Sequence, residues 1–551
     1  MNPERLLKLF DRVAEAPDAV VRLRRLVLDL AVRGKLVEQN SREEPAALLL
    51  ATIHAESAQP IKKKITEYSF AVPYILPKSW HWSKIEEISH NWGQKIPDKH
   101  FTYIDVSAID SKRGVISSPS VVEPKKAPSR ARKIVQVGSV IYSTVRPYLL
   151  NVAVIEKEYS PEPIASTAFS ILHPFEGVYN RYLWYWLRSP AFIEIVSEKM
   201  RGQAYPAINE RNFAALPIPI PPTLEQYRIV QRVDELMALC DQLEAAQTNR
   251  EQRRDRLSAA ALDRLVNAEP SEEGHTAARF YLNRLPRLVW KVEHVRALRR
   301  TVLDLAVRGN LTIQKPEDEK LSFKSLNYED FIFNIPPNWL WTKMGLLTSF
   351  VTSGSRGWAQ YYSKDGAIFI RIGNLDYDSI RIDLHYTQCV DPPKSAEGTR
   401  TRVVPGDILI SITGDTGMVG LVPKSISDAY INQHIALARP LPGLCNEYLA
   451  RYCTSTYALQ FLKNSQRGIK NSLGLNDIRN LPVPLPPLAE QHRIVQRVDE
   501  LMILCDQLEV VLQTSQQTTS RLLDALIAEA LSEESPDLET FETETQLALS
   551  D

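Results

Sequence analysis

The stretch LPIPIPPTLEQYRIVQRVDELMALCDQLE, residues 216–244, decides the fold because it returns as LPVPLPPLAEQHRIVQRVDELMILCDQLE at residues 481–509. The two copies are 265 residues apart and agree at 23 of 29 positions. Each copy opens with alternating prolines, which hold the backbone extended and disfavour helix. Apolar residues then recur at spacings of 4, 3, 4 and 3, as Ile229, Val233, Leu236, Cys240 and Leu243. This pattern predicts a helix with an a/d heptad seam.

A second repeat lies upstream of each of these segments. LRRLVLDLAVRGKL at residues 23–36 returns as LRRTVLDLAVRGNL at residues 298–311, identical at 12 of 14 positions. The pattern predicts an amphipathic helix, and Gly34 and Gly309 follow its last turn, where a left-handed glycine commonly ends a helix. A repeat of about 265 residues is too long for a solenoid and indicates tandem duplication of one module.

The heptad pattern extends over about 40 residues in each copy, from 224 to 266 and from 488 to 530. A helix of that length spans ~60 Å. We expect the two helices to pack against each other as a coiled-coil strut, and the alternative is a pair of core helices in a bundle. Cys240 and Cys505 hold equivalent seam positions and are expected to be small buried hydrophobes. The Arg24-Arg25 and Arg299-Arg300 pairs are expected to be solvated or to contact protein.

Between the repeats lie two stretches, 85–200 and 344–466, that share little sequence. Lys133–Ser143 reads as strand, turn, strand before a loop, and Thr401–Ser411 reads the same way. Helices are expected near residues 179–187 and 447–462. The predicted fold class is therefore α+β, with two mixed α/β domains separated by long coiled-coil helices and an approximate two-fold internal duplication.

Charge is divided unevenly between these parts. Residues 60–215 carry 21 Lys and Arg against 14 Asp and Glu, a net charge of +7, and residues 315–480 carry 18 against 16, a net charge of +2. Because the whole chain has 66 of each sign, the remaining segments carry a net charge of −9. Basic variable domains on an acidic frame are the pattern expected if the variable domains face a polyanion.

Arg, Lys, Asn, Gln and similar side chains in loops can bond to base edges or phosphates, although any one of them is more often a structural or surface residue. The candidate DNA-binding residues are Arg146, Tyr148, Asn151, Arg201, Gln203 and Tyr205 in the first stretch, and Ser355, Arg356, Arg371, Asn374, Thr413, Gln433, His434, Arg467, Lys470 and Asn471 in the second.

Composition and motifs exclude several other classes of protein. Five scattered cysteines without a CxxC motif argue against a disulfide framework and a zinc ribbon. No signal peptide or membrane span is predicted, so a cytoplasmic protein is expected. Asp391-Pro-Pro-Lys394 lacks the aromatic residue of an adenine methyltransferase motif, and the glycine-rich segment 414–420 lacks the Lys-Ser/Thr of a phosphate loop. No catalytic, cofactor-binding or metal-binding residue is predicted.

The paired LDLAVRG helices, the two Pro-Pro-x-x-Glu-Gln segments and the VDELMALCDQLE and VDELMILCDQLE seams resemble the specificity subunit of type I restriction–modification systems. The resemblance covers nearly the whole chain. It implies two target-recognition domains that each read one half of a split, asymmetric DNA site, with helices that set the gap. It also implies partners: double-stranded DNA, two methylation subunits that use S-adenosylmethionine, and restriction subunits that use ATP and magnesium.

The resemblance and the repeats together predict the domain limits. These are 1–58, an N-terminal helical segment; 59–222, the first target-recognition domain; 223–314, a central helical region; 315–487, the second target-recognition domain; 488–531, a distal helix; and 532–551, an acidic disordered tail. Two other readings compete with a non-catalytic DNA-recognition subunit: a protein–protein scaffold without DNA readout, and a stand-alone DNA methyltransferase or nuclease.

Overall fold

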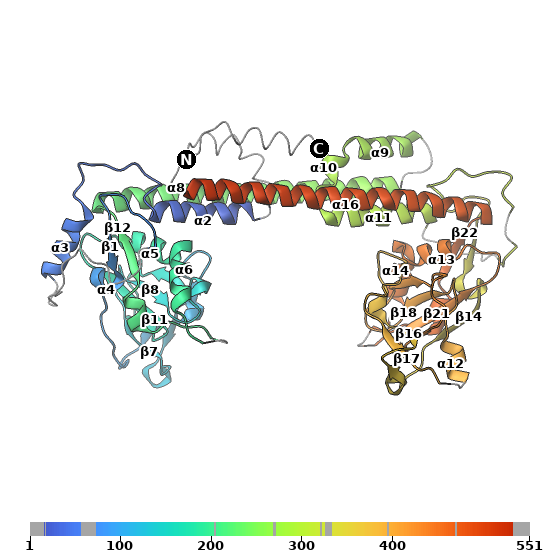
Figure 1. Ribbon diagram of the computed structural model, residues 1–551, viewed down its shortest axis with the longest axis horizontal. Helices are drawn as coiled ribbons and strands as arrows, with labels where there is room; N and C mark the ends of the chain where they lie inside the picture. The colour runs from blue at the N-terminus through green and yellow to red at the C-terminus, as the bar shows by residue number, and fades with distance from the viewer. Residues whose placement is uncertain are drawn as a thin grey trace. The chain divides into compact units, whose positions relative to one another are not determined.

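The computed structural model describes residues 16, 18–56, 73–202, 205–267, 272–319, 322–324, 333–393, 396–468 and 471–532. It divides into two compact units: unit 1 is Met1–Thr248 with Gln517–Asp551, and unit 2 is Asn249–Gln516. Each unit combines a sheet-containing α/β domain with stretches of long helix (Figure 1). The fold is therefore mixed α/β with two sheet-containing domains. The predicted acidic tail, from residue 533 onward, lies outside the described residues.

The domain of unit 1 contains two four-stranded sheets, in the orders β2-β11-β8-β9 and β6-β3-β10-β7. Strands β8 and β11 are antiparallel, whereas β3 and β10 are parallel. Its strands are β2 (Ser89–His90), β3 (Phe101–Ile104), β4 (Ile109–Asp110), β5 (Val115–Ile116), β6 (Ser120–Val122), β7 (Ala131–Ile134), β8 (Val140–Ser143), β9 (Val152–Val154), β10 (Pro163–Ser166) and β11 (Phe169–Pro174). Its helices are α3 (Ala46–Glu56), α4 (Ile85–Ile88), α5 (Asn180–Arg188), α6 (Pro190–Lys199) and α7 (Glu210–Ala214).

The domain of unit 2 repeats this plan, with sheets in the orders β14-β21-β18-β19 and β15-β17-β16-β20. Strands β18 and β21 are antiparallel and β16 and β20 are parallel, as in unit 1. Its strands are β14 (Thr348–Ser353), β15 (Tyr362–Ser363), β16 (Ala367–Ile370), β17 (Gln388–Val390), β18 (Ile408–Ser411), β19 (Val419–Leu421), β20 (Ala429–Ile431) and β21 (Ile435–Pro440). Its helices are α12 (Ala396–Thr401), α13 (Asn446–Cys453), α14 (Thr456–Asn464) and α15 (Leu475–Arg479).

The proline-rich segments form edge strands. In unit 1, β12 (Pro217–Ile220) pairs only with β1 (His81–Lys84), and in unit 2, β22 (Pro482–Leu485) pairs with β13 (Leu340–Lys343). A two-stranded sheet tolerates prolines because the missing N–H groups can face away from the partner strand. The Tyr182 and Tyr448 hydroxyls donate hydrogen bonds to the carbonyls of Pro219 (2.8 Å) and Pro484 (2.6 Å), so each segment is fixed to its domain.

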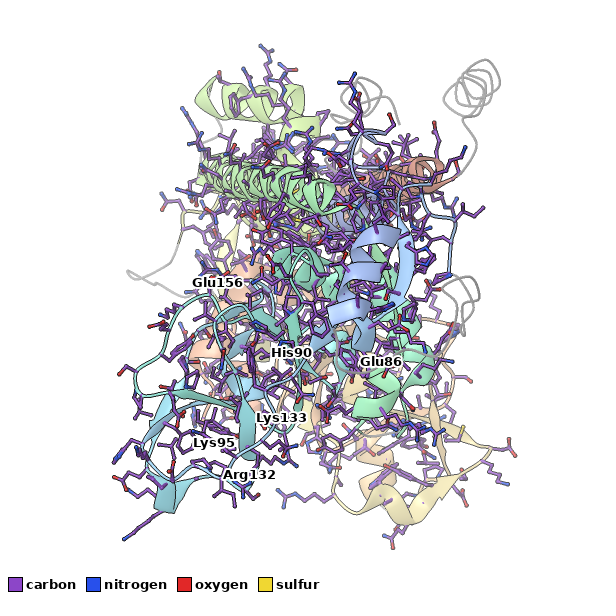
Figure 2. All side chains as sticks on the ribbon, turned by 90° about the vertical axis from the view of Figure 1, so that its left-hand side faces the viewer. Glu86, His90, Lys95, Arg132, Lys133 and Glu156 are labelled. Carbon is purple, nitrogen blue, oxygen red and sulfur yellow. The ribbon has the colours of Figure 1, made fainter. Side chains whose placement is uncertain are left out.

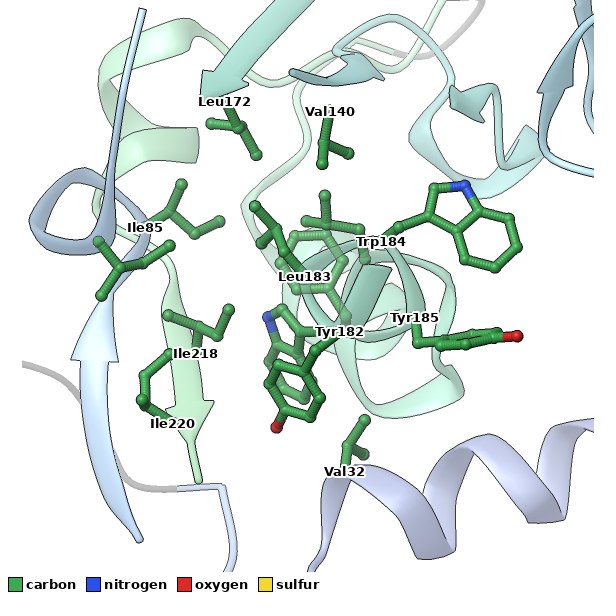
Figure 3. Packing of buried hydrophobic residues seen from close by; sticks show 14 of the residues in the cluster. Val32, Ile85, Val140, Leu172, Tyr182, Leu183, Trp184, Tyr185, Ile218 and Ile220 are labelled. Carbon is green, nitrogen blue, oxygen red and sulfur yellow. The ribbon is translucent and has the colours of Figure 1, made fainter. Parts of the chain in front are cut away.

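The main core of unit 1 joins the first sheet, helix α5 and the start of the long helix. Figure 3 shows Tyr182 and Leu183 of α5 facing Ile218 and Ile220 of β12, with Val32 of the N-terminal helix beside them. Ile229 and Val233 complete this cluster and are almost fully buried. Burying an aliphatic side chain of this size stabilises the fold by about 1.5–3 kcal/mol, so the domain and the helix start form one cooperative core.

The two long helices are α8 (Thr223–Asn267) and α16 (Leu488–Leu531), within a residue or two of the predicted limits. Each seam has more than one packing partner. Ile229 and Val233 enter the domain core, while Cys240 and Leu243 pack on Val20 and Leu23 of helix α2 (Ala19–Val32). Cys505 and Leu508 of α16 pack beside helix α11 (Val292–Val307) and also share an apolar cluster with Leu262 of α8, so the two long helices meet there as expected. Both cysteines are buried as predicted.

Helices α2 and α11 make the same ionic contacts in their own units. Arg24 lies 2.6 Å from Asp241 and 2.7 Å from Glu244 of α8, and Arg299 lies 2.6 Å from Asp506 and 2.7 Å from Glu509 of α16. These arginines therefore contact protein. Helix α2 also meets the end of α16 through Ala19 and Leu523, so three helices pack together in unit 1.

The LDLAVRG motif anchors each of these helices to its domain. Asp29 accepts a hydrogen bond from the backbone N–H of Ala191 at the start of α6 (3.3 Å), and Asp304 accepts one from Thr456 at the start of α14 (3.0 Å). A carboxylate satisfies a free N–H at a helix N-terminus and suits its positive end. Gly34 and Gly309 follow with φ of 71° and 78°, which confirms the left-handed glycine.

Each domain is also joined to its long helix by a buried carboxyl group, from the Glu-Gln of the Pro-Pro-x-x-Glu-Gln segment. The Glu225 and Glu490 side chains are fully buried. Glu225 accepts hydrogen bonds from Trp80 Nε1 (3.0 Å) and Gln39 Nε2 (2.7 Å). Burial raises the pKa of Glu225, while the bonds from Trp80 and Gln39 oppose that shift.

The unit 2 copy of this joint has one more donor. Glu490 accepts hydrogen bonds from Trp339 Nε1 (2.9 Å), Gln314 Nε2 (2.6 Å) and Thr312 Oγ1 (3.0 Å). By the 275-residue offset, valine stands at position 37 where unit 2 has Thr312. The neighbouring Gln226 accepts from the Tyr179 N–H and Gln491 from the Cys445 N–H. The joint therefore ties together segments nearly 200 residues apart in sequence.

Two secondary-structure predictions need correction. Thr401–Ser411 contains one strand, β18, because Thr401 ends helix α12 and Arg402 makes only an isolated bridge to Tyr430. The helix expected over 447–462 is two helices, α13 and α14, because the Ser455 side chain caps a new helix by accepting from Ala458 N (3.3 Å). Unit 2 also holds α9 (Glu272–Asn283) and α10 (Leu285–Leu288). Within the described ranges, no helix is long and apolar enough to cross a bilayer.

Candidate nucleic-acid interface

Two loops of unit 1 lie side by side and carry most of the first set of predicted residues. The loop after β8 contains Arg146 and Tyr148, and the loop after α6 contains Arg201 and Tyr205. Isolated bridges pair Val145 with Ala207 and Arg201 with Ala207, and the Arg146 N–H donates to the Pro206 carbonyl (2.8 Å). The backbone therefore holds the two loops as one surface.

The side chains on this surface are accessible. Tyr205 is 69% exposed and Tyr148 is 44% exposed, as is Leu149 beside it at 46%. The Arg146 guanidinium lies over the Tyr205 ring, 4.5 Å from its centroid, a cation–π contact that orients the arginine. Asn151 lies at the base of the loop, where its carbonyl accepts from the Ser143 N–H (3.0 Å). Gln203 lies outside the described residues.

The loop after β8 has a strained backbone. Arg146 and Leu150 have φ of 48° and 57°, in the left-handed region, and they flank a 3₁₀ turn, Pro147–Leu149. For residues with a Cβ this region costs about 1–2 kcal/mol each. The turn is fixed from below, since Pro147 is buried and Arg188 Nη1 donates to the Leu150 carbonyl (3.3 Å). Such strain collects at functional sites.

Unit 2 builds an equivalent loop pair. The loop after β18 contains Thr413, the loop after α14 contains Arg467 and Asn471, and Ser472 bridges to both Thr413 and Arg467. The Gly414 N–H donates to the Asn471 carbonyl (3.2 Å). Arg467 is highly exposed, although Asp477 pairs with it at 2.9 Å. Lys470 lies outside the described residues.

Other predicted residues of unit 2 lie around the same edge. Ser355 bridges to Asn432, and the His434 carbonyl accepts from the Ile412 N–H that begins the first loop (2.8 Å). The Gln433 and His434 side chains are hydrogen-bonded at 2.9 Å. The structure thus brings Ser355, Gln433 and His434 to the strand ends beside Thr413.

Arg356, Arg371 and Asn374 play different parts. Arg356 and Arg371 are exposed, whereas Asn374 is 4% exposed. Asn374 accepts from the Arg371 N–H (2.8 Å) and donates to the carbonyls of Asp383 (2.7 Å) and Tyr386 (3.3 Å). Its amide is used to hold a loop, so the structure gives Asn374 a folding role and does not expose it to a ligand.

Basic side chains also gather at and beside strand β7, in the β6-β3-β10-β7 sheet of unit 1. Figure 2 shows Lys95, Arg132 and Lys133 toward the end of the domain away from α2 and α8. Lys133 is 5% exposed and lies 2.8 Å from Glu210, and Lys95 pairs with Glu162. Part of the +7 net charge is therefore neutralised within the domain. Among the described residues, no group of three His, Cys, Asp or Glu could hold a metal ion.

Sequence reasoning missed Leu149, Leu150 and the buried joint of Glu225 and Glu490. Leu149 and Leu150 were passed over because an apolar residue in a loop carries no motif. The structure singles out Leu149 by its exposure and Leu150 by its left-handed backbone. The joint did leave a signal, because both Glu-Gln pairs and both tryptophans, Trp80 and Trp339, recur in the repeats. What the sequence could not show is that these residues meet.

The chain thus has two α/β domains, each joined to a long helix and each with an equivalent pair of loops. This arrangement is typical of modular recognition proteins. Residues 77–251 and 394–514, more than half of the chain, match the family model described as type I restriction modification DNA specificity domain. The chain belongs to this family.

Named relatives agree with the family model. The chain is 26% identical to the EcoAI specificity subunit of Escherichia coli, over 93% of this chain and 94% of that one, and 27% identical to the EcoEI specificity subunit over the same shares. A solved chain, from a study of complex assembly and conformational transition of the type I R-M system, is 25% identical. It covers 84% of this chain and 100% of that one, with a TM-score of 0.54. The protein is therefore a DNA-specificity subunit, the role that the family model and the names of these relatives describe.

Proposed function

We propose that the protein recognises a bipartite, asymmetric DNA sequence, with each domain reading one half through its loop pair. One observation carries the proposal: the same loop pair is built twice with different residues, since the N–H of Arg146 donates to Pro206 in unit 1 and the N–H of Gly414 donates to Asn471 in unit 2. A homodimer of one reader would be limited to a palindrome, whereas two different readers in one chain are not. Covalent linkage also makes the second binding event intramolecular.

The loop residues divide into two chemical roles. Arg146, Arg201, Arg467 and Lys470 are suited to phosphates or guanine, and Asn471, Thr413 and Gln433 are suited to base edges. The remaining predicted residues, Tyr148, Asn151, Tyr205, Ser355, Arg356, Arg371 and His434, complete the candidate surface. The buried amide of Asn374 counts against a direct role for that residue.

The frame is proposed to hold the partners and to set the gap. Leu239 of α8 is 56% exposed and Leu504 of α16 is 58% exposed, at equivalent positions in the repeat, beside Ile503 at 56%. Exposed aliphatic residues on a helix favour a protein interface. We assign these faces to two methylation subunits, which with restriction subunits would carry S-adenosylmethionine, ATP and magnesium. The two-fold duplication and a coiled-coil strut belong to this proposal.

Exchange of residues 60–215 for the matching segment of a relative tests the division of labour. The exchanged segment includes Trp80, one of the two donors to Glu225, so the relative is chosen to have tryptophan at that position and the exchanged domain should then fold on the same helix. Sequencing of methylated DNA in a host that carries the whole system should show one half of the recognised site changed and the other half unchanged. A change in both halves, or in neither, would contradict the proposal. A protein scaffold without DNA readout would leave the methylated sequence unaffected.

A further inference from the structure

The two domains have the same backbone conformation at two positions of an equivalent loop but differ in the residues that occupy them. In unit 1 the third and next-to-last residues of the loop after β8 are Arg146 and Leu150, both left-handed. In unit 2 the third and next-to-last residues of the equivalent loop are Gly414 and Gly417, with φ of 74° and 91°. Glycine adopts this conformation without strain. Unit 1 therefore has side chains at two left-handed positions, Arg146 and Leu150, where the equivalent positions of unit 2 are glycines.

The turn between these residues presents a rigid apolar tip. Tyr148 and Leu149 are both nearly half exposed, while Pro147 beneath them is buried. Hydrogen bonds from the Leu149 N–H to the Arg146 carbonyl (2.9 Å) and from the Leu150 N–H to the Pro147 carbonyl (3.0 Å) close the turn. A projecting tip that is held this firmly loses little conformational freedom when it enters a binding partner.

Cationic groups surround this tip. Arg146 lies over the ring of Tyr205, and Arg201 is exposed on the adjoining loop, in a domain whose sequence from 60 to 215 has a net charge of +7. An apolar tip flanked by arginines matches DNA better than it matches a protein core, because the phosphates of a duplex lie on either side of its stacked bases.

We propose that Arg146–Leu150 is a wedge that inserts Tyr148 and Leu149 between two base pairs of the half-site read by unit 1, with Arg146 and Arg201 on the flanking phosphates. This inference rests on the proposed function and deepens it. Apolar side chains used in this way partly unstack a base step and kink the duplex.

Unit 2 has no equivalent tip among its described residues. The corresponding turn contains Asp415 and Thr416, and Thr416 is 7% exposed with its hydroxyl bonded to the Gln466 amide (2.5 Å). Insertion by Asp415 would bring a carboxylate into the base stack, which is unfavourable. The deformation is therefore one-sided. Since pyrimidine–purine steps unstack most readily, the half-site of unit 1 should contain such a step at the wedge.

The test uses the full chain assembled with its methylation subunits and a duplex that carries the methylated sequence found in the host. The adenine analogue 2-aminopurine, which brightens when it is unstacked, is placed in turn at each adenine of the unit 1 half-site, on either strand, other than the methylated adenine, so that the recognised sequence is kept. The wild-type complex should brighten the probe at one step. Y148A/L149A should abolish that signal and weaken binding by roughly tenfold or more, the scale expected for lost stacking. It should leave the dependence of affinity on salt unchanged.

Two further variants separate the wedge from its surroundings. R201A should keep the fluorescence signal and reduce the salt dependence, because it removes a phosphate contact. R146G should fold at least as firmly as the wild type, since it removes backbone strain, yet bind DNA more weakly. A signal absent from the wild type, or retained in Y148A/L149A, would overturn the wedge. If the chain and its subunits showed no preference for the two-part sequence at all, the proposed function would fail instead.

Discussion

Replacing Glu225 and Glu490 by glutamine should have unequal effects, although the two residues occupy the same position in the repeat. Glu225 uses only Oε1 as an acceptor, and its buried Oε2 has no hydrogen-bond partner. Glu490 uses both oxygens, since Oε1 accepts from Gln314 and Thr312, and Oε2 accepts from Trp339. Glutamine has one accepting oxygen and replaces the other oxygen with a donating NH₂ group. The loss of stability therefore depends on whether one or both carboxylate oxygens accept hydrogen bonds.

The magnitudes follow from the contacts. In E225Q the amide oxygen can keep both bonds and the new NH₂ replaces an oxygen without a partner, so the free energy of unfolding should change by less than about 1 kcal/mol. In E490Q the NH₂ must face a buried donor in either orientation, which costs about 1–3 kcal/mol. E225A should lower the free energy of unfolding by about 2–4 kcal/mol, because it leaves Trp80 Nε1 without an acceptor and opens a cavity.

The pH dependence has a definite sign. Because burial raises the pKa of Glu225 above its ordinary value of 4.5, the folded chain holds a proton that the unfolded chain releases near that value. The stability of the wild type relative to E225Q is then greatest below pH 4.5. It falls as the pH rises through the folded-state pKa, and becomes constant above it.

Hydrogen exchange followed by mass spectrometry measures these effects unit by unit. Peptides covering residues 73–90 report on the Glu225 joint, and peptides covering 333–347 report on the Glu490 joint. E225Q should leave exchange nearly unchanged, and E490Q should accelerate it in the second set only. As a control, Q314E in E490Q restores an acceptor opposite the new amide and should recover part of the loss. Equal effects of E225Q and E490Q would refute the reasoning from oxygen use.

Other perturbations test the frame and its turns. Insertion of four residues after Thr248 rotates the helix by ~400° and lengthens it by ~6 Å, so methylome sequencing should show a longer gap between unchanged half-sites; an unchanged gap would mean that α8 is not the ruler. G34A should destabilise unit 1 more than G93A does. Both glycines are left-handed, which costs an alanine about 1–2 kcal/mol, but only at Gly34 would the new Cβ lie 2.4 Å from Pro77 Cγ. Urea unfolding of the two variants measures the difference, and equal midpoints would contradict the clash.

The frame could be predicted from the sequence because its signals are periodic and occur twice. The limits of α8 and α16, the left-handed glycines after α2 and α11, and the buried Cys240 and Cys505 all follow from local pattern and repetition. Local pattern does not name a partner, however. An a/d seam requires an apolar neighbour, and the chain supplies its domain core and α2 for residues 229–243.

The variable domains were less predictable for a related reason. Their strands have only 2–6 residues, and their pairing joins segments that are distant in sequence. The candidate residues Arg146 and Tyr205 were chosen by chemical type, and their contact arises from a backbone bridge that leaves no sequence signal. Asn374 was of a suitable type as well, but its amide is saturated by backbone groups. Residue type predicts what a side chain can do and not whether it is free to act.

The buried contacts of Glu225 and Glu490 lie apart from the exposed loops, and this separation explains how one frame can carry two domains of different sequence specificity. At the joint, Glu225 and Glu490 are fully buried, and a substitution that removes an accepting oxygen leaves a donor unsatisfied at a cost of about 1–3 kcal/mol, roughly a tenth or more of a domain's stability. At the loops, Tyr148 and Tyr205 are exposed, and exposed substitutions usually change stability by less than about 0.5 kcal/mol. The hydrogen bonds that fix each domain to its helix come from Trp80 and Trp339, which lie outside the candidate loops, so they do not depend on which loop side chains are present. Recognition can therefore change in either domain while the joints stay as they are.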